Sequence, residues 1–407
     1  MCSMESLNGR GRETDIFHTK GVSVSLQAKL SNNVNVLYNR YTVGSSFGNK
    51  IKLGRYSHCL TYTCIISFVN IVQNKMVLAK VFKYQHMFRG FPKFSDLKLV
   101  EEELPEIEDG EFLAEAVYLS VDPYMRAYAP RIPIGSTMIG SQVAKITESK
   151  NPDYPVGKYV VANFGWRTHT ISNGKEEGVV FQPYILPDFE GLPISYGIGG
   201  LGRIGNTAYF GLLDICKPKE GETVVISGAA GSVGSIAGQI AKIQGCTVIG
   251  IAGSEEKGKW LTEELGFDHF INYKTDDVEK ALKAAAPNGI DCYFDNVGGD
   301  ISSTVIYQMN HFGRISVCGS ISSYNSINEP EDILIQFPLV FKQLRMEGFN
   351  VSRWSDRHME GIKQNLKWIK EGKLKCRETV TNGFENMFEA FTEMLKGKNV
   401  GKAVVKV

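Results

Sequence analysis

VVISGAAGSVGSIAGQIAKIQGCTVIGIAGS, residues 224–254, is the stretch that determines the expected fold. Its first apolar run, 224–226, is typical of a strand buried in a parallel sheet. A glycine-rich turn follows at 228–234, and apolar residues then recur at helical spacing as far as Ala241. A second apolar run, 247–251, supplies the next strand. The order strand, turn, helix, strand predicts a βαβ unit.

The glycine turn is a candidate phosphate-binding site. Its glycines fall at 228, 231 and 234, so the spacing is GxxGxxG and differs from the usual GxGxxG. An ordinary tight turn before a packed helix is the alternative. The flanking strands and helix favour a nucleotide site, because backbone can approach a pyrophosphate there and the helix start offers free N–H groups.

The end of the second strand indicates which dinucleotide binds. An NAD site usually has an acidic residue about 20 positions after the first glycine, where it bonds the ribose 2′-hydroxyl. Here Ala252-Gly253-Ser254 occupies that place, with Lys257 and then Tyr273 beyond it. Small residues with a cation nearby favour the 2′-phosphate of NADP. Glu255 and Glu256 oppose this choice unless their side chains point to solvent.

Length and composition indicate a globular α/β chain without an obvious polymeric partner. At 407 residues, two domains are expected. The formal net charge of +1 provides no field that would attract nucleic acid or a membrane surface. The eight cysteines lie at 2, 59, 64, 216, 246, 292, 318 and 376, and no pair or cluster has metal-ligand spacing. Reduced, buried thiols fit a reducing compartment.

Residues 1–75 differ in composition from the rest. They are rich in Ser and Asn and have no sustained apolar periodicity. The apolar stretch 63–72 is too short to span a bilayer and too far from the start to be a signal peptide. We expect a disordered or spurious extension before Met76, with an organelle-targeting segment as the alternative.

From Met76 the sequence predicts two lobes. Residues 76–200 contain short runs typical of an antiparallel, barrel-like lobe. Residues 201–376 alternate strands and helices, which predicts a doubly wound parallel sheet with its ligand beyond the carboxyl ends of the strands. A glycine-dense stretch, 197–211, lies at the junction and is expected to precede a short helix. The final strand, 401–407, is expected to return to the first lobe.

Six motifs resemble those of the zinc-independent medium-chain dehydrogenases/reductases. They are VDPYMR (121–126), TAYFGLL (207–213), AAGSVGS (229–235), DCYFDNVGG (291–299), FGRISVCGSISSYN (312–325) and GFENM (383–387). The resemblance covers the chain after residue 76. It implies a GroES-like substrate domain at 76–200, a Rossmann domain at 201–376, and a return to the substrate domain at 377–407. It also implies NADPH as cofactor, a cytoplasmic location and a homodimer.

The family's binding positions carry over onto matching residues of this sequence. The turn Gly231, Ser232, Val233 and Gly234 would hold the pyrophosphate, and Lys257 and Tyr273 the 2′-phosphate. The other implied cofactor contacts are Asn296, Cys318, Gly319, Ser320, Ile321, Ser322, Ser323, Tyr324, Phe349, Asn350, Val351 and Asn399. The sequence departs from the family at 202–205, where GRIG replaces a GMPG turn, and after Asn325, where a run of prolines is missing. Both departures border the expected substrate pocket.

The residues favour reduction of a conjugated C=C bond. No GHE stretch occurs, and no metal site of the alcohol dehydrogenase type is expected. Hydride transfer to an α,β-unsaturated ketone or aldehyde then needs a hydrogen-bond donor at the oxygen that becomes an enolate. We expect the phenol of Tyr324 to supply it. Tyr124 is a weaker candidate for orienting substrate, and Arg126 either anchors a carboxylate or holds its loop.

The expected substrates are small lipid enones of the 15-oxo-prostaglandin type and reactive alkenals. The resemblance extends to NADP-dependent oxidation of the 12-hydroxyl group of leukotriene B4. Two alternatives remain, a quinone reductase of the zeta-crystallin type and a catalytically idle NADPH-binding protein. The VDPYMR spelling opposes the first, and the intact Tyr324 opposes the second.

Overall fold

The computed structural model describes residues 76–176, 181–327 and 335–407, and the backbone of four strands before them. The chain divides into two compact units, Met1–Met76 and Val77–Val407. The first unit contains an antiparallel sheet in the order β1-β2-β3-β4. Its strands are β1 (Arg12–Thr19), β2 (Val22–Lys29), β3 (Tyr38–Ser45) and β4 (Lys50–Leu53). We expected no regular structure here, and the strands differ from that expectation. The presence of this segment in the mature protein stays a prediction.

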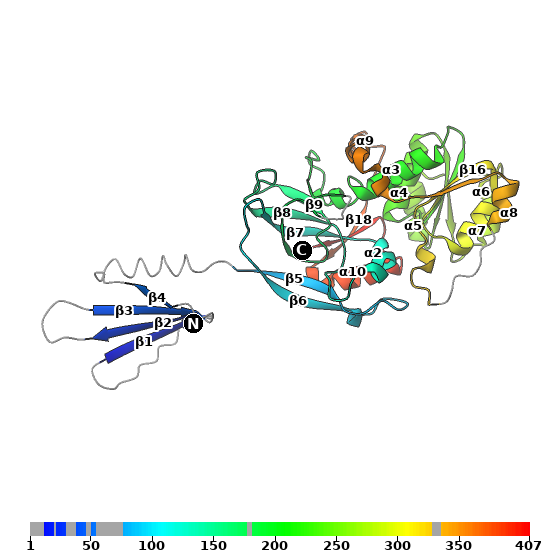
Figure 1. The fold of residues 1–407 in the computed structure, drawn as a ribbon. Helices are drawn as coiled ribbons and strands as arrows, with labels where there is room; N and C mark the ends of the chain where they lie inside the picture. The colour runs from blue at the N-terminus through cyan, green and yellow to red at the C-terminus, as the bar shows by residue number, and fades with distance from the viewer. Residues whose placement is uncertain are drawn as a thin grey trace. The chain divides into compact units, whose positions relative to one another are not determined.

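A six-stranded parallel sheet forms the core of the cofactor lobe, with helices packed around it (Figure 1). Its strand order is β14-β13-β12-β15-β16-β17. Its strands are β12 (Thr223–Ser227), β13 (Thr247–Ala252), β14 (His269–Asn272), β15 (Ile290–Asp295), β16 (Met309–Val317) and β17 (Arg345–Gly348). The strand order reverses between β12 and β15, where such a sheet opens a crevice for its ligand.

Helices cover both faces of this sheet because the central strand is apolar on both sides. Val224 and Ile226 pack with α3, α4 and α9, whereas Val225 packs with α6 and α7. The helices on the first face are α3 (Arg203–Phe210), α4 (Ser232–Ile243) and α9 (His358–Lys370). The other helices of the lobe are α5 (Glu255–Lys259), α6 (Val278–Ala285), α7 (Gly299–Tyr307) and α8 (Gln336–Phe341). The sheet and its helices confirm the predicted Rossmann fold.

The β-rich lobe is built on a seven-stranded sheet in the order β11-β9-β8-β7-β19-β18, with β10 also paired to β7. Its strands are β7 (Phe112–Val121), β8 (Gln142–Ser149), β9 (Tyr159–Ala162), β10 (His169–Ser172), β11 (Tyr184–Ile185), β18 (Glu378–Asn382) and β19 (Lys402–Lys406). The lobe also holds the hairpin β5 (Val77–Tyr84) and β6 (Leu97–Leu104), with helices α2 (Tyr124–Tyr128) and α10 (Met387–Leu395). Strand β19 runs antiparallel to β7, so the chain's end lies in this sheet.

The glycine-dense stretch was interpreted wrongly, because α3 lies inside it and does not follow it. Gly205 and Gly211 serve close packing there. A Cβ at Gly205 would lie 1.9 Å from the carbonyl oxygen of Gly200, and one at Gly211 would lie 2.5 Å from the ring of Phe349. Among the residues that the structure describes, no helix is both long and apolar enough to cross a membrane.

Candidate active site

The glycine turn between β12 and α4 leaves a backbone cradle at the sheet's switch point. Gly228 has φ +58°, in the left-handed region that glycine favours. A Cβ at Gly234 would lie 2.5 Å from the carbonyl oxygen of Gly228, so only glycine fits there. Gly231 begins the helix without a side-chain cap, and the N–H groups of its first turn are therefore open to an anion. The cradle fits the pyrophosphate of a dinucleotide.

Two lysines gather at the ends of β13 and β14. The ring of Tyr273 lies so close to Gly253 that a Cβ there would be 2.8 Å away. Lys257 donates from Nζ to the carbonyl oxygen of Gly397 at 2.6 Å, and the ammonium of Lys274 lies 6.0 Å from the Tyr273 ring centre. Burial and then the charge of Lys274 lower the pKa of Lys257. No carboxylate of a described residue lies within 4.0 Å of either amine, so this corner can accept a 2′-phosphate.

The two glutamates next to Lys257 are occupied elsewhere. Glu255 accepts a hydrogen bond from the side chain of Asn272 at 2.7 Å, and Glu256 lies 3.8 Å from Arg377. Glu255 is thus held by a neighbour, whereas the charge of the exposed Glu256 still acts on Lys257 and raises its pKa. The sequence analysis missed Lys274, although its place directly after Tyr273 was a usable signal.

Asp295, at the end of β15, organises the next part of the crevice. Its carboxylate is buried and accepts hydrogen bonds from Ser227 Oγ (3.0 Å), Tyr293 Oη (2.8 Å), Val297 N (2.9 Å), Gly298 N (2.9 Å) and Ser302 Oγ (2.7 Å). Asn296 is held in turn, because its Nδ2 donates to the carbonyl oxygen of Ser227 at 2.7 Å. The ends of β12 and β15 are therefore one rigid edge.

The loop after β16 carries Tyr324 and is tied to that edge. The carbonyl oxygen of Asp295 accepts from the amides of Cys318 at 2.8 Å and Gly319 at 3.1 Å. The Ser320 amide donates to Tyr324 Oη at 3.2 Å, which leaves the phenol proton available for another acceptor. Burial is the main cause that raises the pKa of Tyr324, so the phenol is protonated at neutral pH. Burial also raises the pKa of Cys318 to about 12, so that thiol is neutral.

The remaining loop residues are half-buried or exposed around Tyr324. Ile321 lies in a short 3-10 helix with Ser322 and Ser323, and the Ser322 hydroxyl donates to the carbonyl oxygen of Val297 at 2.6 Å. The Ser323 hydroxyl donates to the carbonyl oxygen of Ser320 at 2.8 Å. These bonds fix the loop's shape and leave its outer surface open.

The further predicted cofactor residues lie on two segments, 349–351 and the loop that holds Asn399. Phe349 is partly buried, and its ring centre lies 6.3 Å from that of Phe294, against the core of the cofactor lobe. Asn350 donates from Nδ2 to Tyr128 Oη at 3.2 Å. Asn399 donates to the carbonyl oxygen of Gly401, a residue that pairs with the glycine turn at Gly231. Asn399 is thus placed behind the cradle.

Helix α2 places Tyr124 and Arg126 at the boundary between the lobes. Arg126 is 6% exposed and donates to the Asn325 side chain at 3.0 Å and to the carbonyl oxygen of Gly90 at 3.0 Å. These hydrogen bonds to protein atoms favour the alternative in which Arg126 holds its loop over the one in which it binds a substrate carboxylate. Burial raises the pKa of Tyr124 to about 12, against the lowering effects of Arg203 and Ser141.

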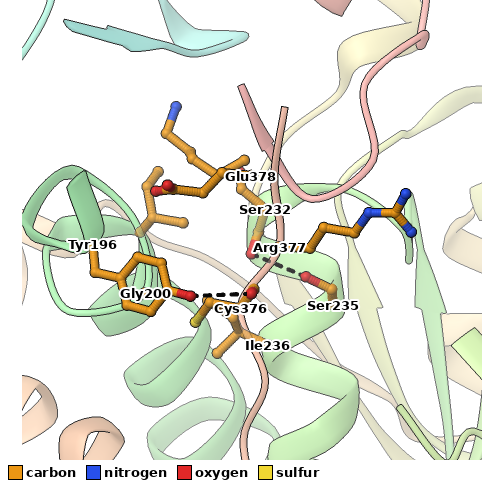
Figure 2. A pocket seen from close by; sticks show the side chains of 10 residues that line it. Tyr196, Gly200, Ser232, Ser235, Ile236, Cys376, Arg377 and Glu378 are labelled. Atoms are coloured by element: carbon orange, nitrogen blue, oxygen red, sulfur yellow. Dashed lines mark hydrogen bonds between the residues drawn. The ribbon is translucent and has the colours of Figure 1, made fainter. Parts of the chain in front are cut away.

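A small cavity lies beside α4, which lines it with Ser232, Ser235 and Ile236 (Figure 2). It has a volume of about 10 Å³, which is room for roughly one water molecule. Tyr196 donates to the carbonyl oxygen of Cys376 at its rim, and Glu378 Oε1 has no hydrogen-bond partner. A larger hollow of about 560 Å³ lies among loops of the β-rich lobe, lined in part by Asn151 and Tyr154. Tyr324 lines neither of these two cavities.

Comparison with known proteins decides the family. The family model described as the N-terminal domain of oxidoreductase matches residues 80–180, and the one described as zinc-binding dehydrogenase matches 232–371. Prostaglandin reductase 1 of Bos taurus is 51% identical over 333 residues, covering 81% of this chain and 100% of that protein. The chain belongs to the medium-chain dehydrogenase/reductase family. Within it, the relatives indicate the zinc-independent branch, as the motifs predicted.

Two further relatives are similar to this chain over most of their length. The NADPH-dependent curcumin reductase of Escherichia coli (strain K12) is 40% identical and covers 78% of this chain and 94% of its own. The structure of CurA from Vibrio vulnificus in complex with NADPH has a TM-score of 0.76 and 37% identity, with 81% and 99% of the two chains covered. Among the described residues, no group of three His, Cys, Asp or Glu side chains could hold a metal ion.

Proposed function

We propose that this protein is an NADPH-dependent reductase of the C=C bond in α,β-unsaturated ketones and aldehydes. The observation that carries the proposal is the phenol of Tyr324. It is protonated, held by the Ser320 amide, and located on a loop tied to the strand edge that bears the glycine cradle. The relatives support it, since they include a prostaglandin reductase and an NADPH-dependent curcumin reductase.

The residues present fit NADPH. The turn 231–234 would hold the pyrophosphate, and Lys257, Lys274 and Tyr273 would hold the 2′-phosphate. When bound, the cofactor's nicotinamide would supply a hydride to the β-carbon of the substrate, and water or a hydroxyl group would supply the proton that the α-carbon takes up. The Tyr324 phenol donates a hydrogen bond to the carbonyl oxygen, where negative charge develops, and so stabilises the transition state. The bonds of Asp295 keep this loop and the cradle in one arrangement.

The assay is oxidation of NADPH with a 15-oxo-prostaglandin, an alkenal and a quinone in parallel. We expect turnover with the first two, and loss of the conjugated C=C bond in the product. Turnover with the quinone alone would favour a quinone reductase of the zeta-crystallin type. NADPH binding without turnover on any of them would favour an idle NADPH-binding protein. Oxidation of leukotriene B4 at its 12-hydroxyl group with NADP is the further activity to test.

The second partner proposed is another copy of this chain. Strand β17 is at the end of its sheet's strand order. Large apolar side chains are exposed nearby, on β16 and α8, at Phe312, Phe337, Val340 and Phe341. Such exposed groups and an unpaired strand edge are typical of an interface. Light scattering should give the mass of a dimer, and Phe341→Glu should reduce it to that of a monomer.

We also propose a cytoplasmic location and a role in lipid metabolism. The described cysteines Cys216, Cys246, Cys292, Cys318 and Cys376 are free thiols, which fits a reducing compartment. Fractionation of cells that express the full chain tests the location, and recovery in an oxidising compartment would contradict it.

A further inference from the structure

Lys402, the first residue of β19, is the one buried lysine among the residues that the structure describes. Its ammonium has three protons, and each has an acceptor. It donates to Asp122 Oδ1 at 2.9 Å and to the carbonyl oxygens of Val121 at 2.7 Å and Ala403 at 2.8 Å. Asp122 is buried as well, with 2% of its surface exposed. Because three acceptors surround the amine, its charged form is the one that fits this place.

Stability alone does not explain an ion pair at this place. Each ion loses its hydration on burial, and the attraction between the two ions offsets that cost only in part, so apolar residues of similar volume are often as stable. Burial is accordingly the main cause that lowers the pKa of Lys402, against the raising effect of the Asp122 carboxylate. The pair does provide a fixed geometry, because the three donors of one ammonium are directed at the end of β7 and the start of β19.

In the β-rich lobe, the ion pair fixes the residue that precedes α2. The carbonyl oxygen of Asp122 accepts from the amide of Met125 at 3.2 Å, within the first turn of this helix. The next residue, Arg126, donates to the side chain of Asn325 at 3.0 Å. Asn325 directly follows Tyr324. A displacement of Asp122 would therefore move α2 and, through it, the loop that carries the phenol.

In the cofactor lobe, the residue before Lys402 is bonded to the glycine cradle. The amide of Gly401 donates to the carbonyl oxygen of Ala230 at 2.9 Å, and Gly401 forms a parallel bridge with Gly231. Gly401 has φ +69°, and a Cβ there would lie 2.0 Å from a backbone carbonyl oxygen, so only glycine fits. Two consecutive residues, 401 and 402, thus join the cradle to the ion pair.

We propose that Lys402 is a positioning residue, whose ion pair with Asp122 holds α2 and the Tyr324 loop at a set place relative to the glycine cradle. The inference rests on the proposed function, because it explains how the phenol and a cofactor held at the cradle meet one substrate molecule. Lys402 acts through Asp122 and α2. An error of about 1 Å in such an alignment costs on the order of 100-fold in rate.

The variant that isolates this role is Lys402→Met combined with Asp122→Asn, which removes both charges and keeps side chains of similar size. Lys402→Met alone leaves a buried carboxylate without its partner and should lower the Tm, whereas the double variant should recover most of that loss. We expect the double variant to bind NADPH as the wild type does, because the bond from Gly401 to the cradle is made by backbone atoms. Its kcat on an alkenal should fall by about tenfold or more, with little change in KM.

The effect of Tyr324→Phe in each background is the decisive readout. In the wild-type background this replacement should reduce kcat by about 100-fold. In the double variant the phenol is no longer aligned, so the same replacement should reduce kcat by less than about tenfold. The control is Lys242→Met with Asp268→Asn, which removes an ion pair of 2.8 Å at the opposite, amino end of the parallel strands. There kcat and the full effect of Tyr324→Phe should both be kept.

The outcomes separate this inference from the proposed function. Recovery of the wild-type kcat together with the Tm in the double variant would show that the ion pair is only structural and would overturn the inference. An undiminished effect of Tyr324→Phe in that variant would overturn it as well. Should the double variant fold poorly, Asp122→Asn alone provides the same comparison, because it keeps the shape of the side chain. Absence of turnover with every enone in the wild-type protein would overturn the proposed function, and the inference with it.

Discussion

The replacement Tyr324→Phe tests directly the hydrogen-bond donor proposed for the substrate's carbonyl oxygen. It removes one oxygen atom and keeps the ring. In the structure that oxygen accepts the Ser320 amide at 3.2 Å and holds one proton that no described residue accepts. The variant therefore loses the donor to substrate and one hydrogen bond within the loop.

The two losses differ in size. A missing donor at a developing oxyanion costs on the order of 100-fold in kcat, equal to about 2.7 kcal/mol. The Ser320 amide loses a bond worth about 0.5–1.5 kcal/mol in a loop where water can replace it. We therefore expect Tyr324→Phe to fold with nearly unchanged Tm, to bind NADPH within a few-fold of wild type, and to lose turnover about 100-fold.

Single-turnover and steady-state rates with an alkenal and a 15-oxo-prostaglandin measure this loss. Tyr128→Phe, which removes a neighbouring phenol, is the matched control, and Tyr124→Phe tests the weaker candidate. Tyr128 binds Asn350 on the other side of the boundary and should affect kcat little. Because the pKa of Tyr324 is raised, activity should not fall through phenol ionisation until the pH exceeds 10. Unchanged turnover of Tyr324→Phe on every enone would refute the role of Tyr324 as the hydrogen-bond donor. A large loss of turnover in Tyr124→Phe would assign that role to Tyr124 instead.

Three further perturbations test the cofactor site and the boundary. Lys257→Ala should weaken NADPH at least about tenfold and NADH little, because only the 2′-phosphate needs the amine. The exposed Lys259→Ala on the same helix is the control, and equal losses for both cofactors would show a structural role. Gly234→Ala should abolish tight NADPH binding, because its Cβ would lie 2.5 Å from a carbonyl oxygen. Gly348→Ala is the control and should keep the wild-type Tm, because no atom lies within 4 Å of its added Cβ. The pKa of His358 is lowered to about 4 in the folded protein, so the unfolded chain takes up a proton at a higher pH than the folded one. As pH falls from 6.5 to 4, the unfolding free energy should therefore drop by about 3 kcal/mol more in wild type than in His358→Gln. Equal dependence on pH in the two proteins, measured by chemical denaturation, would contradict this.

The cofactor half of the site was largely predictable, because its signals are local in sequence. A few consecutive residues are enough to recognise each of its parts: the glycine turn, the apolar strands beside it and the small residues after β13. The structure brings Lys257 and Tyr273 to one corner, as the spacing suggested. Asp295 carried no signal of its own, since its five donors become neighbours only when the strand ends meet.

The substrate half was less predictable, because it is assembled from distant segments. Arg203 contacts Asn163 and Phe181, which precede it on other elements, and shares a ring neighbour with His358 from α9. No periodicity links these positions. The same is true of the helix α3, which lies inside the glycine-dense stretch 197–211 because Gly205 and Gly211 permit close packing. In both cases tertiary contact, and not local preference, determines the role of the residue.

Arg126 shows why the two halves cannot be considered separately. Its residue type suggested a ligand for substrate, yet its donors are used by Gly90 and Asn325. It therefore connects the β-rich lobe to the residue that follows Tyr324. The position of the phenol depends on this bond as well as on the Ser320 amide, because a shift of α2 would move Asn325.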